Sequence, residues 1–332
     1  MSFSDFKVSS VKNFVVSLFV VGYKTQGESI VILFRDDEKQ KILFSMVVDC
    51  FVHEKVNVTR KILDKYGIKT LDAVCWTHPH WDHSYGIDEL VHDYLSPSTT
   101  IFSPKFYYGN LKKDLLRSEC KKTPGIFKSL REEVANNPNI NDVWRTISAS
   151  GDLSLNFTMQ LSADDDVSVK KDIKFYFLTP IGNRTDEFAL EGTEFDAPNE
   201  LSISFIISLD GYNLFFGGDT EYGHAEDIQT SIVKSLRWIK VPHHCSLGGK
   251  SIAERIGPKL DFSTSTIYSK ANLPVEDVQK MYASPEHPLY MTQLPNRKAC
   301  VYGVVQYDYR FNSDNIDVDI TTYGNAGAYT PK

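Results

Sequence analysis

His78-Pro79-His80-Trp81-Asp82-His83 places three of the chain's nine histidines within six residues. In an extended loop, side chains two residues apart point the same way, so His78 and His80 can bind one ion while Asp82 and His83 turn toward a neighbouring ion. Imidazole and carboxylate groups together suit zinc, manganese or iron. Without a metal, so many polar groups beside a buried strand would be poorly compensated. We therefore interpret this stretch, the first histidine motif, as a metal site.

The segments around the motif indicate an α/β fold. Val56–Tyr66 carries apolar residues at helical spacing and ends before Gly67, and Leu71–Thr77 is an apolar run typical of a buried strand. The motif follows this strand directly, so it lies at a strand's carboxyl end, where α/β sheets usually place their chemistry. A further helix is expected over Ile87–Tyr94.

The order of strand, polar loop and helix returns in the second half of the chain. Asp210-Gly211 predicts a tight hairpin, and Asp219 comes soon after the second strand of that hairpin. The elements expected here are the strands Ile203–Leu209 and Tyr212–Phe216, a helix over Ala225–Ser235, a strand over Ser235–Val241, the polar loop Pro242–Lys250 and a helix over Ser251–Ile256.

Length and composition favour one large domain over residues 1–332. A hydrophobic content of 42% with 24% charged residues is typical of a soluble protein with a substantial core. Three apolar stretches in residues 11–50 predict a β-meander. Residues 105–150, rich in Lys and Arg, predict a mostly helical insertion, and residues 286–332 predict a β-rich C-terminal segment.

Charge and cysteine content limit the partners and the compartment. The net charge is −7, so a polyanionic partner would have to be met by a local basic patch or by bound metal. The five cysteines are odd in number, far apart and without a CxxC pair, which favours a reducing cytoplasm over a disulfide framework. The early apolar run Phe14–Val21 is too short for a membrane span, so no membrane partner is expected.

With these motifs in place, the chain resembles the metallo-β-lactamase superfamily. Its hallmark, His-x-His-x-Asp-His, is matched by the first histidine motif. The strand Met46–Cys50 is similar to the superfamily strand that ends in Asp-x-Gly, and Phe216–Asp219 is similar to the strand that ends in Gly-Asp. The resemblance implies a four-layer αββα sandwich and two divalent metal ions bridged by Asp219.

A second segment resembles one branch of that superfamily more closely. Trp238–Ser246, which contains Pro242-His243-His244, is similar to the last histidine segment of the ComEC-like branch, named for the hydrolase domain of a DNA-uptake competence protein. Asn199 and Ser202 match the Asn-x-x-Ser of the same branch, so the similarity covers most of residues 14–285. The resemblance makes His244 a metal ligand and His243 a proton donor or a brace for its neighbour, although the reverse assignment stays open.

Three departures from the family pattern affect this interpretation. Many members carry another ligand histidine between the first motif and the Gly-Asp strand, but here that interval holds only His92, which is expected on a helix. The first ion would then be held by His78, His80 and Asp219 with solvent, so it would bind weakly or accept manganese as readily as zinc. Cys245 replaces the usual Gly, and Asn272-Leu273-Pro274 stands where the branch often has His-Pro.

The leading functional hypothesis is a phosphodiesterase or nuclease that acts on DNA or another phosphodiester with a metal-activated water. The expected metal ligands are His78, His80, Asp82, His83, Asp219 and His244. Asp82 would also orient the nucleophile, and His243 would protonate the leaving oxygen. Lysines of the insertion would hold an anionic substrate, namely Lys112, Lys113, Lys121 and Lys122.

Two other functions remain open. The same metals can hydrolyse a small ester, lactone or amide, which the acidic total charge favours. Alternatively, the chain is a binding or regulatory module whose metal site has degenerated, as the absent histidine and Cys245 indicate. Metal content separates this third hypothesis from the first two, since a degenerate site would hold no metal tightly.

Overall fold

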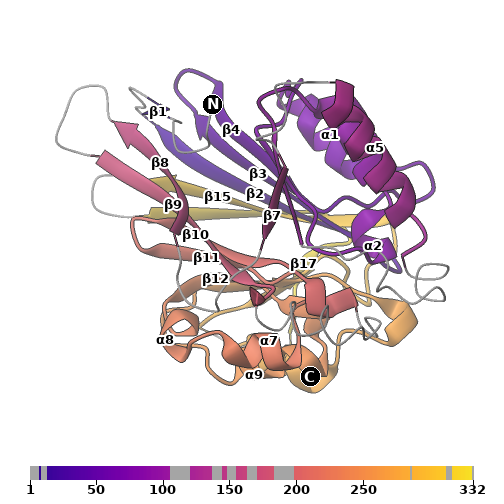
Figure 1. Cartoon of the computed structure of the whole chain (residues 1–332). Helices are drawn as coiled ribbons and strands as arrows, with labels where there is room; N and C mark the ends of the chain where they lie inside the picture. Colours follow the sequence, from indigo (N-terminus) through magenta and orange to yellow (C-terminus); the bar gives the residue numbers. More distant parts are fainter. Residues whose placement is uncertain are drawn as a thin grey trace.

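Two β-sheets pack face to face, and helices cover the outer face of each sheet (Figure 1). The computed structural model describes residues 7–8, 13–104, 120–136, 144–147, 155–162, 170–182, 198–284, 286–311 and 316–330. The layers follow the order helix, sheet, sheet, helix. The four-layer αββα sandwich predicted from the sequence is therefore confirmed.

The first sheet, in the described part of the chain, has eight strands in the order β16-β15-β2-β3-β4-β5-β6-β7. Their bounds are β2 Phe14–Tyr23, β3 Glu28–Asp36, β4 Lys41–Val48, β5 Ala73–Cys75, β6 Thr100–Pro104, β7 Trp144–Ile147, β15 Tyr302–Phe311 and β16 Ile316–Gly324. β2, β3 and β4 pair antiparallel, which confirms the predicted β-meander. β4, β5, β6 and β7 pair parallel.

The second sheet, over the same described ranges, has nine strands in the order β1-β8-β9-β10-β11-β12-β13-β14-β17. Their bounds are β1 Lys7–Val8, β8 Leu155–Ser162, β9 Lys170–Thr179, β10 Ser204–Leu209, β11 Tyr212–Phe216, β12 Leu236–Lys240, β13 Phe262–Ser265, β14 Leu289–Met291 and β17 Gly327–Ala328. Asp210 and Gly211 both have positive φ between β10 and β11, so the predicted hairpin is confirmed. β11 to β14 pair parallel.

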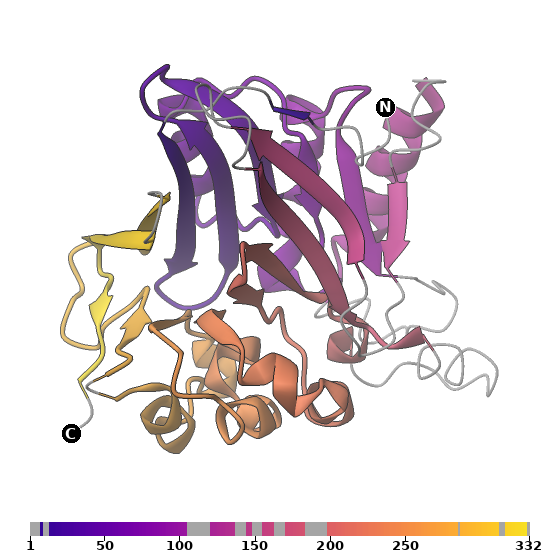
Figure 2. The ribbon, with the colours of Figure 1, turned by 90° about the vertical axis from the view of Figure 1, so that its left-hand side faces the viewer.

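The helices divide into two groups, one for each sheet. Beside the first sheet lie α1 Val58–Lys65, α2 Trp81–Ser84, α3 Ile87–Tyr94 and α5 Thr123–Asn136. Against the second sheet lie α7 Tyr222–Asp227, α8 Thr230–Val233, α9 Lys250–Ala253 and α10 Glu276–Tyr282. Short 3₁₀ turns are η4 Pro198–Leu201, η5 Pro242–Cys245, η6 Leu247–Gly249 and η7 Ser269–Ala271. Figure 2 shows the second group gathered along one side of the molecule.

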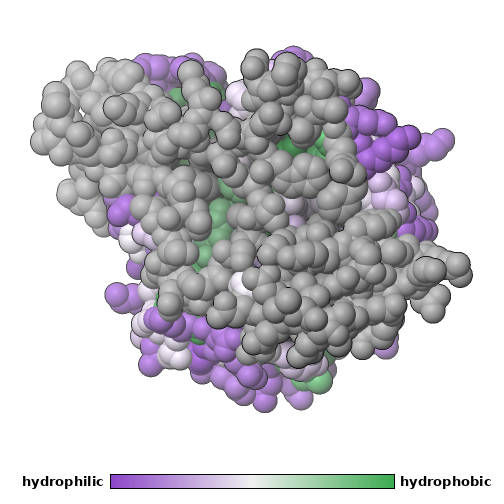
Figure 3. All heavy atoms as spheres, in the orientation of Figure 1, coloured by the Kyte–Doolittle hydropathy of each residue, from purple (hydrophilic) through white to green (hydrophobic). Residues whose placement is uncertain are grey.

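Aromatic side chains fill the space between the two sheets. Phe205 and Phe216 stack with ring centroids 4.6 Å apart, and Trp238 meets Tyr307 edge-on at 5.7 Å across the sheets. A large cluster of buried hydrophobic side chains occupies this layer, and each ring contributes a large buried area. On the face shown in Figure 3, hydrophilic residues lie at the margins where the outer helices are seen in Figure 1.

The predicted insertion and C-terminal segment are described in part. Within 105–150, residues 123–136 form α5 and Trp144–Ile147 form β7, while 105–119, 137–143 and 148–150 lie outside the described residues. Residues 286–330 supply β14 to β17, apart from 312–315. Among the described helices, none is long and apolar enough to cross a membrane.

The single helix predicted over Ala225–Ser235 is wrong, because two short helices, α7 and α8, occupy this range. The chain becomes extended at Ile228, whose side chain is 1% exposed. The Arg255 guanidinium donates hydrogen bonds to the carbonyls of Ala225, Glu226 and Ile228. Burial of Ile228 and these contacts from Arg255, just after α9, therefore outweigh the helical propensity of the segment.

The parallel strands place the predicted site at one edge of the sandwich. β5 ends three residues before His78, β11 ends three residues before Asp219, and β12 ends three residues before His243. The two sheets are joined at this edge, because the Ile203 N–H before β10 donates to the Thr77 carbonyl after β5. Loops from both sheets therefore converge there, as the sequence predicts.

A pair of glycines lets the segment after β14 approach the first sheet. Gly303 of β15 lies opposite Gly22 of β2. A methyl carbon on Gly303 would lie 1.8 Å from the Thr292 carbonyl oxygen, and one on Gly22 would lie 2.1 Å from the Thr292 hydroxyl. Only glycine leaves space for Thr292 at this position.

Gly303→Ala should therefore destabilise the fold, because the atom that the new methyl meets belongs to the backbone. Overpacking of this kind costs about 1–3 kcal/mol, to be measured as the free energy of unfolding in urea. Gly125→Ala is the control, since a methyl on this exposed α5 residue meets nothing within 4 Å. It should stabilise by about 0.5–1 kcal/mol, and equal effects of the two changes would contradict the close approach.

Candidate metal centre

The imidazole and carboxylate groups predicted from the sequence converge on Asp219. Its Oδ2 lies 3.5 Å from His78 Nε2, and its Oδ1 lies 3.3 Å from His83 Nε2. The His244 Nε2 atom lies 3.2 Å from Asp82 Oδ2 and 3.9 Å from Asp219 Oδ2. Asp82 Oδ2 lies 3.6 Å from His83 Nε2. Loops after β5, β11 and β12 thus meet around one carboxylate.

These separations fit ligand atoms arranged around a metal ion. Two atoms that bind one zinc ion tetrahedrally at about 2.1 Å lie about 3.4 Å apart. The Nε2 atoms of His78 and His83 and the Oδ1 atom of Asp219 are buried and make no hydrogen bond within the described part of the chain. Buried polar atoms rarely remain unpaired, so this donor set fits a divalent ion.

Two groups of donor atoms share Asp219. His78, His80 and Asp219 offer atoms that all lie within 4.8 Å of one another. On the other side of Asp219, the side chains of Asp82, His83 and His244 face each other at the distances given above. Side chains that could bind a metal ion therefore lie on both sides of Asp219.

The buried carboxylates of the centre favour positive charge on the groups around them. Burial opposes protonation of His83, but the carboxylates of Asp219, Asp82 and Asp49 outweigh it and raise the pKa of His83 well above its usual value. Burial would raise the pKa of Asp219, yet the surrounding imidazoles hold it well below its usual range. Burial and the neighbouring His83 lower the pKa of His78 to about 3. A divalent ion supplies the charge that the carboxylates otherwise draw onto His83.

Asp49 contacts the His83 imidazole directly and the His78 imidazole through Thr77. Its Oδ2 lies 2.7 Å from His83 Nδ1 and accepts the Thr77 hydroxyl at 2.6 Å, while its Oδ1 accepts the Thr77 N–H. Thr77 Oγ1 in turn lies 2.9 Å from His78 Nδ1. A threonine hydroxyl has one proton, so it accepts from His78 Nδ1–H and leaves Nε2 of His78 with a lone pair. Both oxygens of Asp49 are thus engaged, so Asp49 is better placed to orient His78 and His83 than to bind an ion, although these three side chains also form a conceivable ligand group.

Asn199 and Ser202, which match the Asn-x-x-Ser of the ComEC-like branch, contact the chain around Asp219. The Ser202 hydroxyl accepts the Asp219 N–H at 2.7 Å. Gly218, with φ of +51°, allows this, because a Cβ there would lie 2.5 Å from the Ser202 oxygen. The Asn199 amide donates to Glu221 Oε2 at 3.1 Å. Both residues thus fix the chain on either side of Asp219.

The second histidine pair lies in a strained turn. His243, His244 and Cys245 have φ of +41°, +51° and +62°, a left-handed backbone conformation that residues other than glycine rarely adopt. The turn aims His244 Nε2 at Asp82, and it places His243 Nε2 3.8 Å from Asp219 Oδ2. His243 Nδ1 lies 2.5 Å from Glu221 Oε1. The structure therefore brings both histidines to the centre, with His244 fully buried and His243 17% exposed.

The basic groups predicted to bind substrate are described in part. Lys121 Nζ lies 3.7 Å from the Trp81 ring centroid, and Lys122 Nζ lies 3.1 Å from Asp88 Oδ2 and 4.8 Å from the Tyr85 ring centroid. Both ammonium groups flank the first histidine motif and already contact side chains of the protein. Lys112 and Lys113 lie outside the described residues.

The additional family histidine is absent from the centre. All nine histidines lie in described ranges, and the centre takes His78, His80, His83, His243 and His244. His92 lies exposed on α3, as the sequence predicts. His224 is buried elsewhere, where its Nε2 atom lies 3.2 Å from Glu200 Oε2.

Comparison with known families agrees with this geometry. Residues 33–98 match the family model of the Metallo-beta-lactamase superfamily. The match begins in β3, contains the first histidine motif and ends after α3. The superfamily consists largely of metal-dependent hydrolases, which agrees with the αββα layers and the donor groups around Asp219. No curated protein matches the chain.

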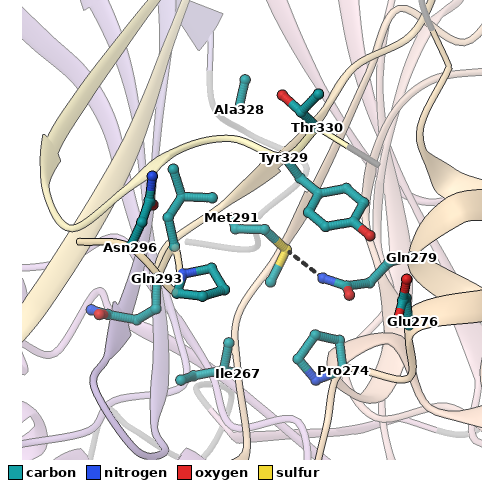
Figure 4. A pocket seen from close by; sticks show the side chains of 12 residues that line it. Ile267, Pro274, Glu276, Gln279, Met291, Gln293, Asn296, Ala328, Tyr329 and Thr330 are labelled. Atoms are coloured by element: carbon teal, nitrogen blue, oxygen red, sulfur yellow. Dashed lines mark hydrogen bonds between the residues drawn. The ribbon is translucent and has the colours of Figure 1, made fainter. Parts of the chain in front are cut away.

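A cavity of about 580 Å³ lies apart from these ligands, beside α10 and the ends of β14 and β17. Figure 4 shows the Tyr329 ring and the Gln279 amide beside Met291, and Gln279 Nε2 lies 3.6 Å from the Met291 sulfur. Its one carboxylate, Glu276, pairs with Lys280 at 2.8 Å. The cavity therefore offers no second metal site among its lining residues.

Asp219→Asn should remove most of the metal retained by the purified protein, because it replaces the shared anionic ligand with a neutral group of equal size. Mutation of a residue that only supports a ligand lowers metal affinity by about 10–100-fold. Loss of a ligand itself should therefore lower the affinity by more than about 100-fold. Elemental analysis after dialysis measures the effect. Asp72→Asn is the control, since Asp72 contacts Ser45 away from the centre. Metal retained at the wild-type level would exclude Asp219 as a ligand.

Cys245→Gly should be at least as stable as Cys245→Ala, although glycine removes one more buried carbon. A left-handed φ strains a residue with a Cβ by about 1–2 kcal/mol, and glycine relieves it. Cys245 is fully buried, so both variants lose the packing of the sulfur equally. Urea unfolding of the two variants, each freed of metal with a chelator, provides the comparison. A glycine variant less stable by about 1 kcal/mol or more would contradict the strain.

Proposed function

We propose that the protein is a metal-dependent phosphodiesterase or nuclease. The observation that carries this proposal is the position of Asp219, whose two oxygens face His78 on one side and His83 on the other. Two ions held side by side would activate water and stabilise both the attacking and the leaving oxygen of a phosphodiester. Zinc is the favoured metal and manganese the alternative, given imidazole and carboxylate ligands.

His243 is positioned to protonate the leaving oxygen. Its Nδ1 is held by Glu221, which also accepts the Ser246 hydroxyl at 2.7 Å. Its Nε2 faces Asp219 Oδ2 at 3.8 Å, and the side chain keeps 17% of its surface exposed. A ring that is fixed at one nitrogen and partly exposed to solvent suits proton transfer to a bound substrate.

Asp82 has a different role in this proposal. It is 4% exposed, and its Oδ2 faces the Nε2 atoms of both His83 and His244. A carboxylate held there can bind an ion and keep a nucleophilic water oriented through a hydrogen bond. Asp82 thus acts on the attacking side, whereas His243 acts on the leaving side.

The substrate proposed is DNA or another phosphodiester. The ComEC-like segment Trp238–Ser246 supports it, together with Lys121 and Lys122 beside the first histidine motif. None of the five cysteines, all of which lie in described ranges, forms a disulfide, which supports a cytoplasmic location. Hydrolysis of a small ester, lactone or amide is the second candidate, favoured by the net charge of −7 and by the contacts that both lysines already make.

His243→Ala should slow cleavage of DNA far more than cleavage of bis(p-nitrophenyl) phosphate. A nucleotide oxygen needs a proton to leave, whereas p-nitrophenolate does not. We expect kcat/KM to fall about 100-fold or more for DNA and less than about tenfold for the activated diester. The assay uses chelator-treated protein supplied with Zn²⁺ or Mn²⁺.

Asp82→Ala is the matched control and should abolish both reactions. Equal losses for His243→Ala on the two substrates, together with loss of metal, would make His243 the ligand and reverse its assignment with His244. Wild-type protein that leaves DNA, RNA and the model diester intact but hydrolyses esters would support the second candidate. Wild-type protein that holds no metal would support a binding module.

A further inference from the structure

A buried ion pair lies directly behind His244, on the side away from Asp219. Lys240 Nζ is 2.6 Å from Glu28 Oε2, and the two side chains are 0% and 2% exposed. Lys240 also donates to the Val241 carbonyl. Burying two charges costs several kcal/mol per ion, and their attraction often repays no more than that. Such a pair contributes little net stability, so its position next to a ligand needs another explanation.

The Thr266 hydroxyl connects this ion pair to His244. Thr266 Oγ1 donates to Glu28 Oε2 at 2.7 Å and lies 2.6 Å from His244 Nδ1. A carboxylate that faces an ammonium group accepts hydrogen bonds and donates none. The single hydroxyl proton therefore goes to Glu28, and the hydroxyl oxygen must accept from His244 Nδ1–H. Nε2 of His244 then carries the lone pair, and this is the atom that faces Asp82 and Asp219.

The same chemical order occurs on the other side of the centre. Asp49 accepts the Thr77 hydroxyl at 2.6 Å, and Thr77 Oγ1 lies 2.9 Å from His78 Nδ1. The two chains of carboxylate, threonine and imidazole come from different parts of the fold: β4 and β5 supply one, and β3 and β13 supply the other. Two independent segments thus present an imidazole in the same tautomer, with Nε2 toward Asp219.

Glu28 itself is not placed to bind the ion. One of its oxygens lies within 4.8 Å of nitrogen atoms of His83 and His244, so the three side chains form a conceivable ligand group. However, Oε2 is taken by Lys240 and Thr266, and it lies 3.8 Å from His244 Nδ1, on the wrong side of the ring. The Lys240 ammonium group, 2.6 Å from Glu28 Oε2, would also repel a dication bound to Glu28, and burial strengthens this repulsion.

We propose that Thr266 and Glu28 are positioning residues for His244, and that Lys240 is the cation that keeps Glu28 a pure hydrogen-bond acceptor. Thr266 sets the tautomer and the ring angle of His244, while Tyr268 stacks on the same ring at 5.7 Å. This inference rests on the metal centre of the proposed function but not on its substrate. It predicts that Thr266 governs the affinity of the ion on the His244 side.

Thr266→Val removes the hydroxyl with little change of shape, and Thr266→Ser restores it. Chelator-treated protein is titrated with Co²⁺ in competition with a chromophoric chelator, and the visible absorption of bound Co²⁺ reports ligand geometry. We expect Thr266→Val to weaken one of two Co²⁺ equivalents about 10–100-fold and to change its spectrum. Thr266→Ser should return both to near the wild-type values, because serine offers the same donor and acceptor.

Thr264→Val is the matched control, from β13, the strand that ends just before Thr266. Thr264 is fully buried, and its hydroxyl lies 2.7 Å from the Tyr307 hydroxyl in the core between the sheets. The substitution removes an equally buried hydroxyl but touches no ligand, so both Co²⁺ affinities should stay at wild-type values. Circular dichroism and urea unfolding check that each variant is folded.

A second variant keeps the test decisive if Thr266→Val does not fold. The double substitution Glu28→Gln with Lys240→Met removes both charges together and should weaken the same Co²⁺ equivalent. Wild-type affinity and spectrum in Thr266→Val or in the double variant would overturn the inference, as would an equal loss in Thr264→Val. Wild-type protein that binds no Co²⁺ would overturn the metal centre and this inference together. Failure to cleave phosphodiesters with Co²⁺ binding intact would overturn only the proposed substrate.

Discussion

The buried carboxylate of Asp219 is the constraint around which the rest of the centre is arranged. It is 1% exposed, and from its own loop after β11 it faces imidazoles of two other loops, one after β5 and one after β12. A charge buried this deeply persists only when opposite charge and hydrogen bonds compensate it. The sandwich meets this need by ending β5, β11 and β12 at one edge, and by joining the two sheets there through Thr77 and Ile203. Any shift between the sheets would separate His78 from Asp219.

Around this constraint, three carboxylates outside the centre hold the far nitrogens of the imidazoles. Asp49 contacts His83 directly, Glu221 contacts His243 directly, and Glu28 reaches His244 through Thr266. Each contact directs the other ring nitrogen inward, which preorganises the centre before any ion or substrate arrives. Two features of this arrangement cost folding free energy, namely the left-handed turn at His243 and the buried Glu28–Lys240 pair.

The sequence predicts those parts of the site whose chemistry is local. The first histidine motif is recognisable because several histidines and an aspartate lie close together in one loop, and Asp219 is recognisable through the resemblance of Phe216–Asp219 to the Gly-Asp strand. Glu28, Glu221 and Thr266 were not predicted as functional residues. Glu28 is separated from Thr266 by 238 positions, and only the packing of one sheet on the other brings them together. An isolated threonine or glutamate carries no local signal of such a contact.

The fold follows the same division between local and tertiary causes. The meander, the Asp210-Gly211 hairpin and the alternation of strands with polar loops depend on local patterns, and they are confirmed. The helix break at Ile228 depends on Arg255, which lies on the segment after α9 and reaches back to its carbonyls. Neither α7 nor α8 contains a proline or any other local stop signal at this point. The break between α7 and α8 is therefore set by tertiary contacts and not by the helical propensity of the segment.

The histidines of the centre differ in their exposure to solvent. His78, His83 and His244 are fully buried, whereas His80 is partly exposed and His243 is 17% exposed. The residues next to these two accessible histidines differ in character. Lys121 and Trp81 lie on the His80 side, and Tyr222 and Leu247, each 60% exposed, follow the Glu221 and Ser246 that hold His243 in place.

This rim therefore combines apolar surface with ammonium groups that already have aromatic or acidic partners. If ions occupy the centre, they would supply most of the electrostatic attraction for the anionic substrate that we propose, because the surrounding carboxylates bring no positive charge of their own. For the proposed substrate, the rim would contribute mainly apolar contact, because Tyr222 and Leu247 are large exposed side chains. The net charge of −7 is consequently compatible with an anionic substrate, provided that the ions are bound first.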